Sequence, residues 1–546
     1  MKVIGFVEVD PAANGLGSRP RWQELLGGRP VLRRVVERAA RVPGLEGVFV
    51  ACPGAAVEAV RGLLAGTPAT VFAAELADLP QRETLRRRRA WSDQGWQGGV
   101  GRAFVWDEEG TPAVVLDGLQ RADAQGALVF SPSAPLVDLG IARCIREHLA
   151  SASSLHMAYS AAPPGLAPWA VSADLAGDLT KMGLTLGEWL DVVRRGMSAL
   201  LEAGSQAACI GLPLAVKASP FRFTWDSDHQ TAFLAALWQG LGERAEDAGA
   251  EDWVRAAAAD PLATRGDHPR LLEVELTTES PVRCRHCPLG DPCGRGGRME
   301  RALAERILAW AGTWDDVLVT LGGRGDPLRH PDLPDLLEAA RAARIRGVHL
   351  QTQALDLHGA LLDAVLSGAV HVVSVCLDAT GPDSWSRVKE PAGFAAVVAN
   401  LDRFLAARKA AGRAWPFLVV EMVRTRANEN EVESFWDAWQ GRADAVVIRD
   451  HDSCAGQRAD LSPIHLHPPE RGICRRLQSK LTVRWDGTVP LCDEDLEGRV
   501  CLGNAVSDSL DALWAGARIE DVRVRHRAGR FAELELCRAC TVWHAL

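Results

Sequence analysis

The feature that most constrains the fold is a regular alternation of apolar runs and amphipathic helical patterns in the second half of the chain. Six β-like runs lie at 271–276, 317–322, 347–352, 371–377, 417–423 and 445–450, and helical patterns lie between them at 299–311, 332–343, 359–367, 394–410 and 429–439. This order predicts parallel strands joined by helical crossovers. Six such strands indicate a partial (β/α)6 barrel over residues 271–450, with its chemistry at the carboxyl ends of the strands.

A similar but shorter alternation occupies the first half. Strand-like runs at 2–9, 47–52 and 127–131, with helical patterns at 31–41, 55–65 and 137–149, predict an α/β domain over residues 1–245 with a mainly parallel sheet. The stretch 246–270, rich in Ala, Asp, Glu and Arg, is interpreted as a linker. A cysteine-bearing domain is expected over residues 451–546.

Charge and cysteine content narrow the function. The net charge of -9 gives no basic surface for nucleic acid. The sequence has no apolar run of the roughly 18 residues that a membrane span needs and no signal peptide, so we expect a cytoplasmic protein. Three of the 13 cysteines lie before residue 270 and ten after it, several in close pairs. In a reducing compartment such pairs favour metal or cluster ligation over disulfides.

The first cysteine group lies directly after the first barrel strand, in ELTTESPVRCRHCPLGDPC. This segment resembles the radical S-adenosylmethionine (SAM) superfamily, which carries C-x3-C-x2-C at this place on a partial TIM barrel. Cys284 and Cys287 match the second and third cysteines, whereas Ser280 stands at the first. The resemblance implies that three ligands hold a 4Fe–4S cluster whose open iron binds SAM.

The third ligand of this group is open. Cys293 would supply it in a C-x2-C-x5-C spacing, whereas the oxygen of Ser280 is a harder ligand that suits iron–sulfur clusters less well. Alternatively the site is vestigial, or Cys284, Cys287, Cys293 and His286 bind zinc.

The SAM-binding residues are also assigned by resemblance. The stretch LGGRGDPLRHPDL at 321–333 is similar to the superfamily's Gly-Gly-Glu-Pro element, which implies that Gly323, Gly325 and Asp326 contact the SAM amine. Ser374 and Asp378, at the end of the fourth strand, stand where that superfamily contacts the ribose. A strand terminus and turn explain these two residues equally well, and for Glu421 in the fifth strand a structural ion pair is expected.

The second cysteine group lies in the tail. Cys474, Gly487 and Cys492 surround a WDG turn, and Cys537 and Cys540 follow at C-x-x-C spacing. We expect the turn to join the runs KLTVRW and TVPLC in a hairpin that brings the first two cysteines together. The order resembles a SPASM or shorter twitch domain, which implies that the four thiolates hold one auxiliary 4Fe–4S cluster. A zinc ribbon is the alternative, and Cys454 and Cys501 remain as spare thiols.

The N-terminal segment VIGFVEVDPAANGLGSRPRWQELLGGRPVL resembles sugar-nucleotidyltransferases with a Rossmann-like domain. The residues that carry that chemistry are altered: Trp22 and Gln23 occupy the region of the phosphate-loop Lys, and Ser133 and Trp169 replace acids. Without a carboxylate for Mg²⁺, transfer is not expected. Asp226 and Asp228 remain as acids that could bind a metal, although turn acids are the commoner interpretation.

The three-part order resembles spiro-SPASM proteins. It implies a radical SAM enzyme that uses 4Fe–4S clusters and SAM to activate a C–H bond of a peptide or glycan-related substrate, with ferredoxin or flavodoxin as reductant. The sequence assigns no catalytic residue. The alternatives are a non-catalytic iron–sulfur or SAM-binding scaffold, a nucleotide-sugar binding protein, and an active nucleotidyltransferase with a regulatory module.

Overall fold

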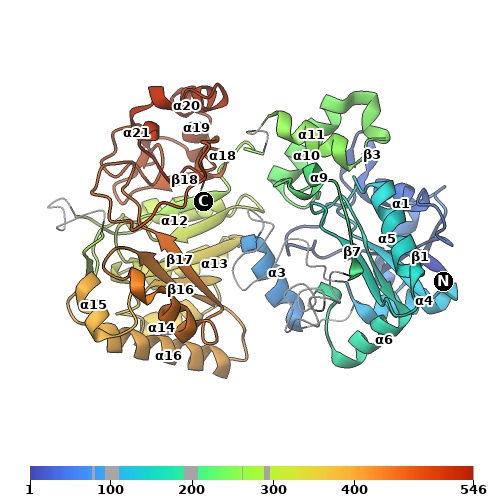
Figure 1. Cartoon of the computed structure of the whole chain (residues 1–546), viewed down its shortest axis with the longest axis horizontal. Coiled ribbons are helices and arrows are strands. Elements are labelled where there is room, and N and C mark those ends of the chain that lie inside the picture. Colours follow the sequence, from blue (N-terminus) through green and yellow to red (C-terminus); the bar gives the residue numbers. More distant parts are fainter. Residues whose placement is uncertain are drawn as a thin grey trace. The chain divides into compact units, whose positions relative to one another are not determined.

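The computed structural model describes residues 1–76, 80–92, 110–187, 189, 207–260, 262, 264–287 and 296–544. The chain divides into two compact units with the boundary between residues 263 and 264, each built around its own sheet (Figure 1). None of the helices in these ranges is long and apolar enough to cross a membrane.

The first unit has a seven-stranded sheet in the order β5-β4-β1-β6-β8-β7-β9. Its strands are β1 (Val3–Glu8), β4 (Val48–Cys52), β5 (Ala69–Ala73), β6 (Gly126–Phe130), β7 (Met157–Ser160), β8 (Trp169–Ser172) and β9 (Cys209–Ile210). Strands β5, β4, β1 and β6 are parallel, as expected, whereas β8 runs antiparallel to both of its neighbours. A short hairpin pairs β2 (Leu25–Leu26) with β3 (Arg29–Pro30).

Helices pack around this sheet. They are α1 (Val31–Ala40), α2 (Val57–Leu63), α3 (Pro80–Ser92), α4 (Pro112–Ala122), α5 (Leu139–Ser151), α6 (Ala173–Met182), α9 (Leu214–Lys217), α10 (Asp228–Leu241) and α11 (Ala250–Ala259).

Helix α11 lies where the sequence predicted a linker. Trp253 is fully buried and stacks on Trp238 of α10, with ring centroids 5.9 Å apart. Trp253, Val254 and Ala257 share one face of the helix and belong to the core of the first unit. This part of the stretch 246–270 therefore belongs to the folded first unit. The sequence suggested a linker because the few apolar residues of the helix are spread among many charged ones.

The second unit has an all-parallel seven-stranded sheet in the order β17-β16-β14-β13-β12-β10-β18. Its strands are β10 (Leu271–Val274), β12 (Leu318–Leu321), β13 (Gly347–Thr352), β14 (Val372–Cys376), β16 (Phe417–Arg424), β17 (Ala445–Asp450) and β18 (Lys480–Val483). Two small antiparallel pairs join β11 (Arg283–Cys284) to β15 (Lys389–Glu390), and β19 (Thr488–Pro490) to β20 (Cys501–Asn504).

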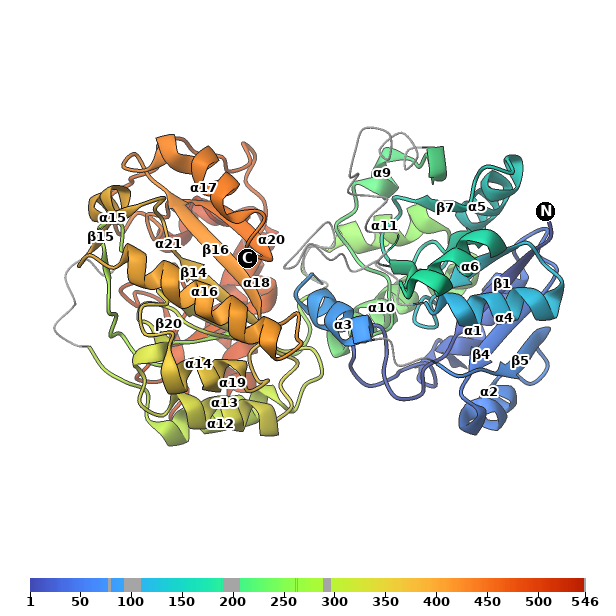
Figure 2. The ribbon, with the colours of Figure 1, turned by 90° about the horizontal axis from the view of Figure 1, so that it is seen from below.

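The first six strands of this sheet follow one another in chain order, so crossovers of one hand place their helices on a single face (Figure 2). The helices are α12 (Arg301–Ala311), α13 (Leu333–Ala342), α14 (Gly359–Leu366), α15 (Pro382–Val388), α16 (Phe394–Ala410) and α17 (Val432–Trp439), and the tail adds α18 (Arg476–Ser479), α19 (Leu510–Trp514), α20 (Ala517–Arg527) and α21 (Glu535–Arg538).

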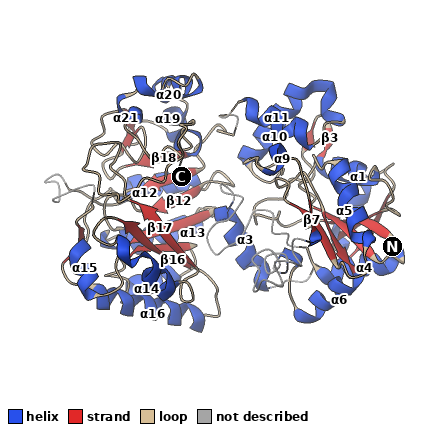
Figure 3. Cartoon of the chain, viewed as in Figure 1, coloured by secondary structure: helices blue, strands red, loops and turns tan. Residues whose placement is uncertain are grey.

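The tail forms the expected turn, but the two runs on either side of it pair with other strands. The WDG turn is present, since Arg484 N donates to Thr488 O at 2.9 Å and Gly487 has a φ of 82°. However, β18 pairs in parallel with β10, and β19 pairs with β20. The tail therefore completes the sheet with β18 as its seventh strand, which Figure 3 labels among the strands of this unit.

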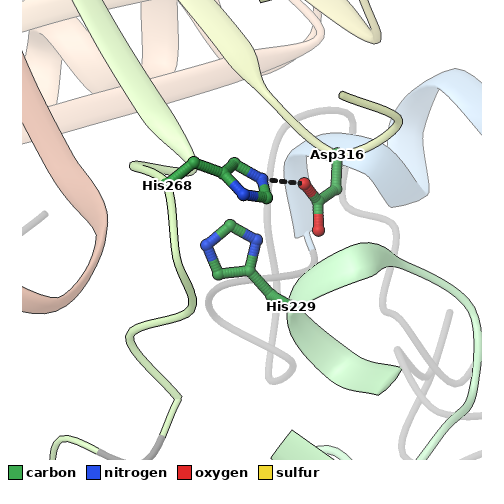
Figure 4. Close-up of side chains that lie close together, drawn as sticks. All are labelled: His229, His268 and Asp316. Atoms are coloured by element: carbon green, nitrogen blue, oxygen red, sulfur yellow. Dashed lines mark hydrogen bonds and ion pairs between the residues drawn. The ribbon is translucent and has the colours of Figure 1, made fainter. Parts of the chain in front are cut away.

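The start of the second unit is fixed by a buried polar contact. His268 Nε2 lies 2.9 Å from Asp316 Oδ1 (Figure 4), and the His268 ring stacks on Trp314 with centroids 3.8 Å apart. Together they tie the chain entering β10 to the chain entering β12.

Candidate functional site

The strands of the second unit carry polar side chains on the face opposite the helices. In β13 and β14, Val348, Leu350, Val373 and Val375 belong to the core, so the alternate residues point to the other face. The polar residues of this face, called the polar face below, are Glu273, Thr320, His349, Gln351, Ser374, Cys376, Glu421, Arg449 and Lys480. Val372, Phe417 and Val419 share the face with them, so polar side chains occupy only part of it.

Hydrogen bonds cross this face from strand to strand. His349 Nε2 lies 2.7 Å from Ser374 Oγ, and His349 Nδ1 lies 3.3 Å from Thr320 Oγ1. Burial lowers the pKa of His349 to about 4, so the ring is neutral at physiological pH. Arg449 forms an ion pair with Glu421 at 2.6 Å, which is the structural role expected for Glu421.

Buried ion pairs connect the first strand of the sheet to the tail. Lys480 Nζ lies 2.7 Å from Glu273 and 2.6 Å from Asp493, next to Cys492. Arg476 in turn contacts Asp493 at 2.9 Å and Glu494 at 3.0 Å. These contacts hold the segment that carries Cys492 against β10.

The first cysteine loop returns to the carboxyl edge of the sheet. Cys284 in β11 pairs with Lys389 in β15, and Arg285 N donates to Val388 O at 2.8 Å. The pairing brings the Cys284 sulfur, a nitrogen of His286 and an oxygen of Asp378 within 4.8 Å of one another. Asp378 follows β14 directly and has a φ of 60°, which turns it back toward the loop.

A buried ion pair lies beside these three groups. Lys389 Nζ is 2.9 Å from Asp378 Oδ2 and also donates to Gln353 Oε1 at 2.7 Å. Burial alone would raise the pKa of Asp378, but the charges of Lys389 and His286 outweigh it and hold the pKa below its usual range. Burial raises the pKa of the Cys284 thiol to about 12, so metal binding there must displace a proton.

The other expected ligands of the first group are placed differently. Cys287 closes a turn onto Cys284, with Cys287 N donating to Cys284 O at 3.0 Å. The Ser280 hydroxyl donates to Val282 O at 2.7 Å. Cys293 lies outside the described residues. The described residues thus offer two thiols and one engaged hydroxyl to a cluster that requires three ligands.

The glycine element lies close to the backbone of the segment that follows β10. A Cβ on Gly325 would lie 2.1 Å from the backbone oxygen of Thr277, and Gly323 has a φ of 93°. Arg324 Nε and Nη2 donate to the two oxygens of Glu275 at 2.5 and 2.6 Å. The element is therefore packed directly on the strand that leads into the cysteine loop.

The acids and hydroxyl assigned to SAM binding have partners within the protein. Both oxygens of Asp326 lie 2.9 Å from Thr352 Oγ1, and Oδ2 accepts from Gln353 N at 2.9 Å. Ser374 is bonded to His349, and Asp378 to Lys389. To contact a ligand, each would have to share or exchange these partners.

The tail cysteines meet around Cys474. Burial raises the pKa of all four thiols, and the Cys474 sulfur adds to the rise at Cys492, Cys537 and Cys540, which places it close to each of them. Arg471 Nη1 donates to Cys540 O at 3.0 Å, and Cys474 N donates to His526 Nδ1 at 3.4 Å.

A tetrahedral zinc site with Zn–S bonds near 2.3 Å puts its sulfurs about 3.8 Å apart. Among residues 264–287 and 296–544, the groups whose ligand atoms all lie within 4.8 Å do not contain three of these four cysteines. The four thiols are therefore not arranged as the ligands of one tetrahedral zinc ion.

Sequence reasoning missed several residues of these sites. Lys389 and Arg476 gave no signal, because a single basic residue has no characteristic spacing and their roles depend on ion pairs that only the fold creates. Glu494 and Asp452 lie within 4.8 Å of the Cys454 sulfur, so this spare thiol has acidic neighbours. Cys501 donates to Gly503 O at 3.2 Å.

In the first unit, the acids that might bind a metal are paired with arginines. Asp228 lies 2.5 Å from Arg21, and Asp226 forms an ion pair with Arg222. A cavity of about 80 Å³ beside Trp22 and Ser133 is far smaller than the roughly 300 Å³ that small-molecule sites begin at.

Comparisons with known proteins found a sequence relative, similar solved structures and a matching family model. An uncharacterized protein of Treponema pallidum (strain Nichols) is 26% identical over 316 residues, covering 55% of this chain and 85% of that protein. Streptococcus suis SuiB bound to its precursor peptide SuiA is 13% identical, with a TM-score of 0.41, over 64% of this chain and 80% of that one. A Leptospira borgpetersenii cytidylyltransferase is 14% identical, with a TM-score of 0.36, over 48% of this chain and 97% of that one.

At these sequence identities and TM-scores, neither of the two solved structures assigns a substrate to this chain. The family match is confined to residues 474–541, which agree with the SPASM model, described as an iron–sulfur cluster-binding domain. This range contains Cys474, Cys492, Cys537 and Cys540. The tail of the second unit is therefore an iron–sulfur cluster-binding segment of SPASM type.

Proposed function

We propose that this protein is a radical SAM enzyme with two 4Fe–4S clusters. In this account Cys284, Cys287 and Cys293 hold the cluster that binds SAM in a partial barrel over residues 271–450. Cys474, Cys492, Cys537 and Cys540 hold the auxiliary cluster. The observation that carries the proposal is the return of the first cysteine loop to the carboxyl edge of an all-parallel sheet, through the pairing of Cys284 with Lys389.

The polar face of the sheet suits the substrate side of this chemistry. When bound, the reduced cluster and SAM supply a radical that abstracts hydrogen from an unactivated C–H bond. Neutral His349 and Ser374 can orient a polar substrate by hydrogen bonds, while the Glu421–Arg449 pair offers both a cation and an anion. We propose a peptide or glycan-related substrate, and a ferredoxin or flavodoxin as reductant.

The test is SAM cleavage by the anaerobically reconstituted full chain. With a strong reductant we expect 5′-deoxyadenosine from the wild type and none from Cys284→Ala/Cys287→Ala, which should keep the iron of its auxiliary cluster. Cys144→Ala, an exposed thiol of the first unit, is the matched control and should retain full activity. Failure of a fully loaded wild type to cleave SAM would exclude the proposal.

A second candidate is a non-catalytic scaffold with a single metal ion at the first site. It is favoured by the sulfur, nitrogen and oxygen ligands that Cys284, His286 and Asp378 place within 4.8 Å of one another. The variant Asp378→Asn separates the two accounts. Loss of bound zinc would support the single ion, whereas unchanged iron content and no zinc in the wild type would support the cluster.

A further inference from the structure

The arginines at the surface of the tail differ in their partners. Arg525 lies 3.0 Å from Asp521 and Arg530 lies 3.3 Å from Glu533, whereas Arg518 donates to Cys501 O at 2.6 Å. Three others adjoin the auxiliary cysteines, and within the described part of the chain they form no ion pair with an acid. We call Arg471, Arg475 and Arg538 the arginine rim.

Two chain segments bring the rim together. Arg475 follows Cys474 directly, and its backbone N donates to Trp543 O at 3.2 Å. Arg538 lies inside the C-x-x-C turn, which closes with Cys540 N donating to Cys537 O at 3.1 Å. Arg471 reaches the same turn through Cys540 O. The side chains of Arg475 and Arg538 are exposed, and Arg471 is half-buried.

The rim is cationic in a chain of net charge -9. Besides burial, the charges of His467, Arg475 and Arg476 lower the pKa of His544, a second sign that positive charge accumulates here. Two exposed acids, Glu470 and Glu535, lie within three residues of the rim in sequence, and Glu535 contacts Arg499 at 3.4 Å. Surface charge of one sign steers the approach of partners of the opposite sign.

We propose that the arginine rim docks an acidic protein electron carrier, which reduces the auxiliary cluster directly. The inference rests on the auxiliary cluster of the proposed function. In the transfer the carrier loses one electron and the oxidised cluster gains it, and no bond is made or broken. The rim adjoins the cluster ligands themselves, so a carrier bound there has a short path to the redox group. An acidic peptide is the competing ligand for such a surface.

The experiment measures how fast reduced flavodoxin, an acidic one-electron carrier, bleaches the visible absorbance of the auxiliary cluster. All proteins compared are reconstituted full chains that carry Cys284→Ala/Cys287→Ala, so that the other cluster does not contribute, and the protein with wild-type arginines is the reference. We expect Arg475→Gln/Arg538→Gln to slow this reduction about tenfold at low ionic strength, and the difference to shrink at high salt. The control Arg525→Gln/Arg530→Gln removes two charges from arginines that are paired with acids and should react like the reference.

Iron content and dithionite, a small chemical reductant, separate the possible failures. If the reference protein holds no iron after reconstitution, the auxiliary cluster itself is absent and the proposed function fails. If dithionite reduces all three proteins alike and both arginine variants match the reference with flavodoxin, the docking inference is overturned. Equal slowing in both doubles would overturn it too, since the effect would then follow net charge.

Discussion

Asp326 illustrates how a residue expected to bind a ligand can instead join two strands. Its carboxylate links the turn after β12 to Thr352 and Gln353 at the end of β13. Burial raises its pKa from 3.8 to about 6, despite these donors. In the folded state, the charged carboxylate of Asp326 is therefore disfavoured relative to its protonated form.

This shift predicts a pH dependence of stability. Between about pH 6 and pH 4 the folded chain binds a proton that the unfolded chain does not, so the free energy of unfolding rises as the pH falls, by up to about 3 kcal/mol. The variant Asp326→Asn should lose this dependence. Urea denaturation of both proteins across this range measures it, and parallel curves would contradict the assignment.

Gly325 makes a second prediction at this scale. Because its Cβ would overlap the Thr277 oxygen at 2.1 Å, Gly325→Ala should lower the free energy of unfolding by about 1–3 kcal/mol. Gly441→Ala, where no heavy atom lies within 4 Å of the added Cβ, should stay within about 0.5 kcal/mol of the wild type. Similar losses in both variants would show that the close approach is unimportant.

At the scale of elements, local patterns predicted most of the second sheet. The runs 347–352 and 445–450 coincide with β13 and β17, because an apolar run between helical patterns is a local signal. The pairing of β18 with β10 and of β11 with β15 could not be predicted, since both join segments more than 100 residues apart. The cysteines were found from their local spacing, whereas Lys389 gave no local signal, because β15 reaches the site through its pairing with β11.

At the scale of elements, we predict that helix α11 contributes to the stability of the first unit. A fragment of residues 1–245 lacks Trp253, Val254 and Ala257 from the core of the first unit, whereas a fragment of residues 1–263 retains them. The longer fragment should unfold cooperatively, and the shorter one should lose several kcal/mol of stability. Thermal unfolding by circular dichroism compares them, and equal transitions would mean that α11 is dispensable.

At the scale of the whole molecule, the two units differ in chemical equipment. The second unit gathers both cysteine groups and the polar face of a parallel sheet. In the first unit Arg21 and Arg222 already neutralise Asp228 and Asp226, so these acids are poorly suited to hold Mg²⁺.

The first unit should therefore release no pyrophosphate from nucleoside triphosphates and sugar phosphates, with or without Mg²⁺. A coupled phosphate assay on the full chain measures this directly. Mg²⁺-dependent release that disappears in Asp226→Asn would contradict the pairing argument and restore the nucleotidyltransferase alternative.

The central claim is that the second unit holds a cluster at each cysteine group. The most direct test is the iron content of a variant with Cys474, Cys492, Cys537 and Cys540 all changed to Ala, reconstituted anaerobically and shown to be folded. The account predicts about four irons per chain, held by Cys284, Cys287 and Cys293. Essentially no iron in this folded variant would contradict it and leave the first site as a vestige or a single-ion site.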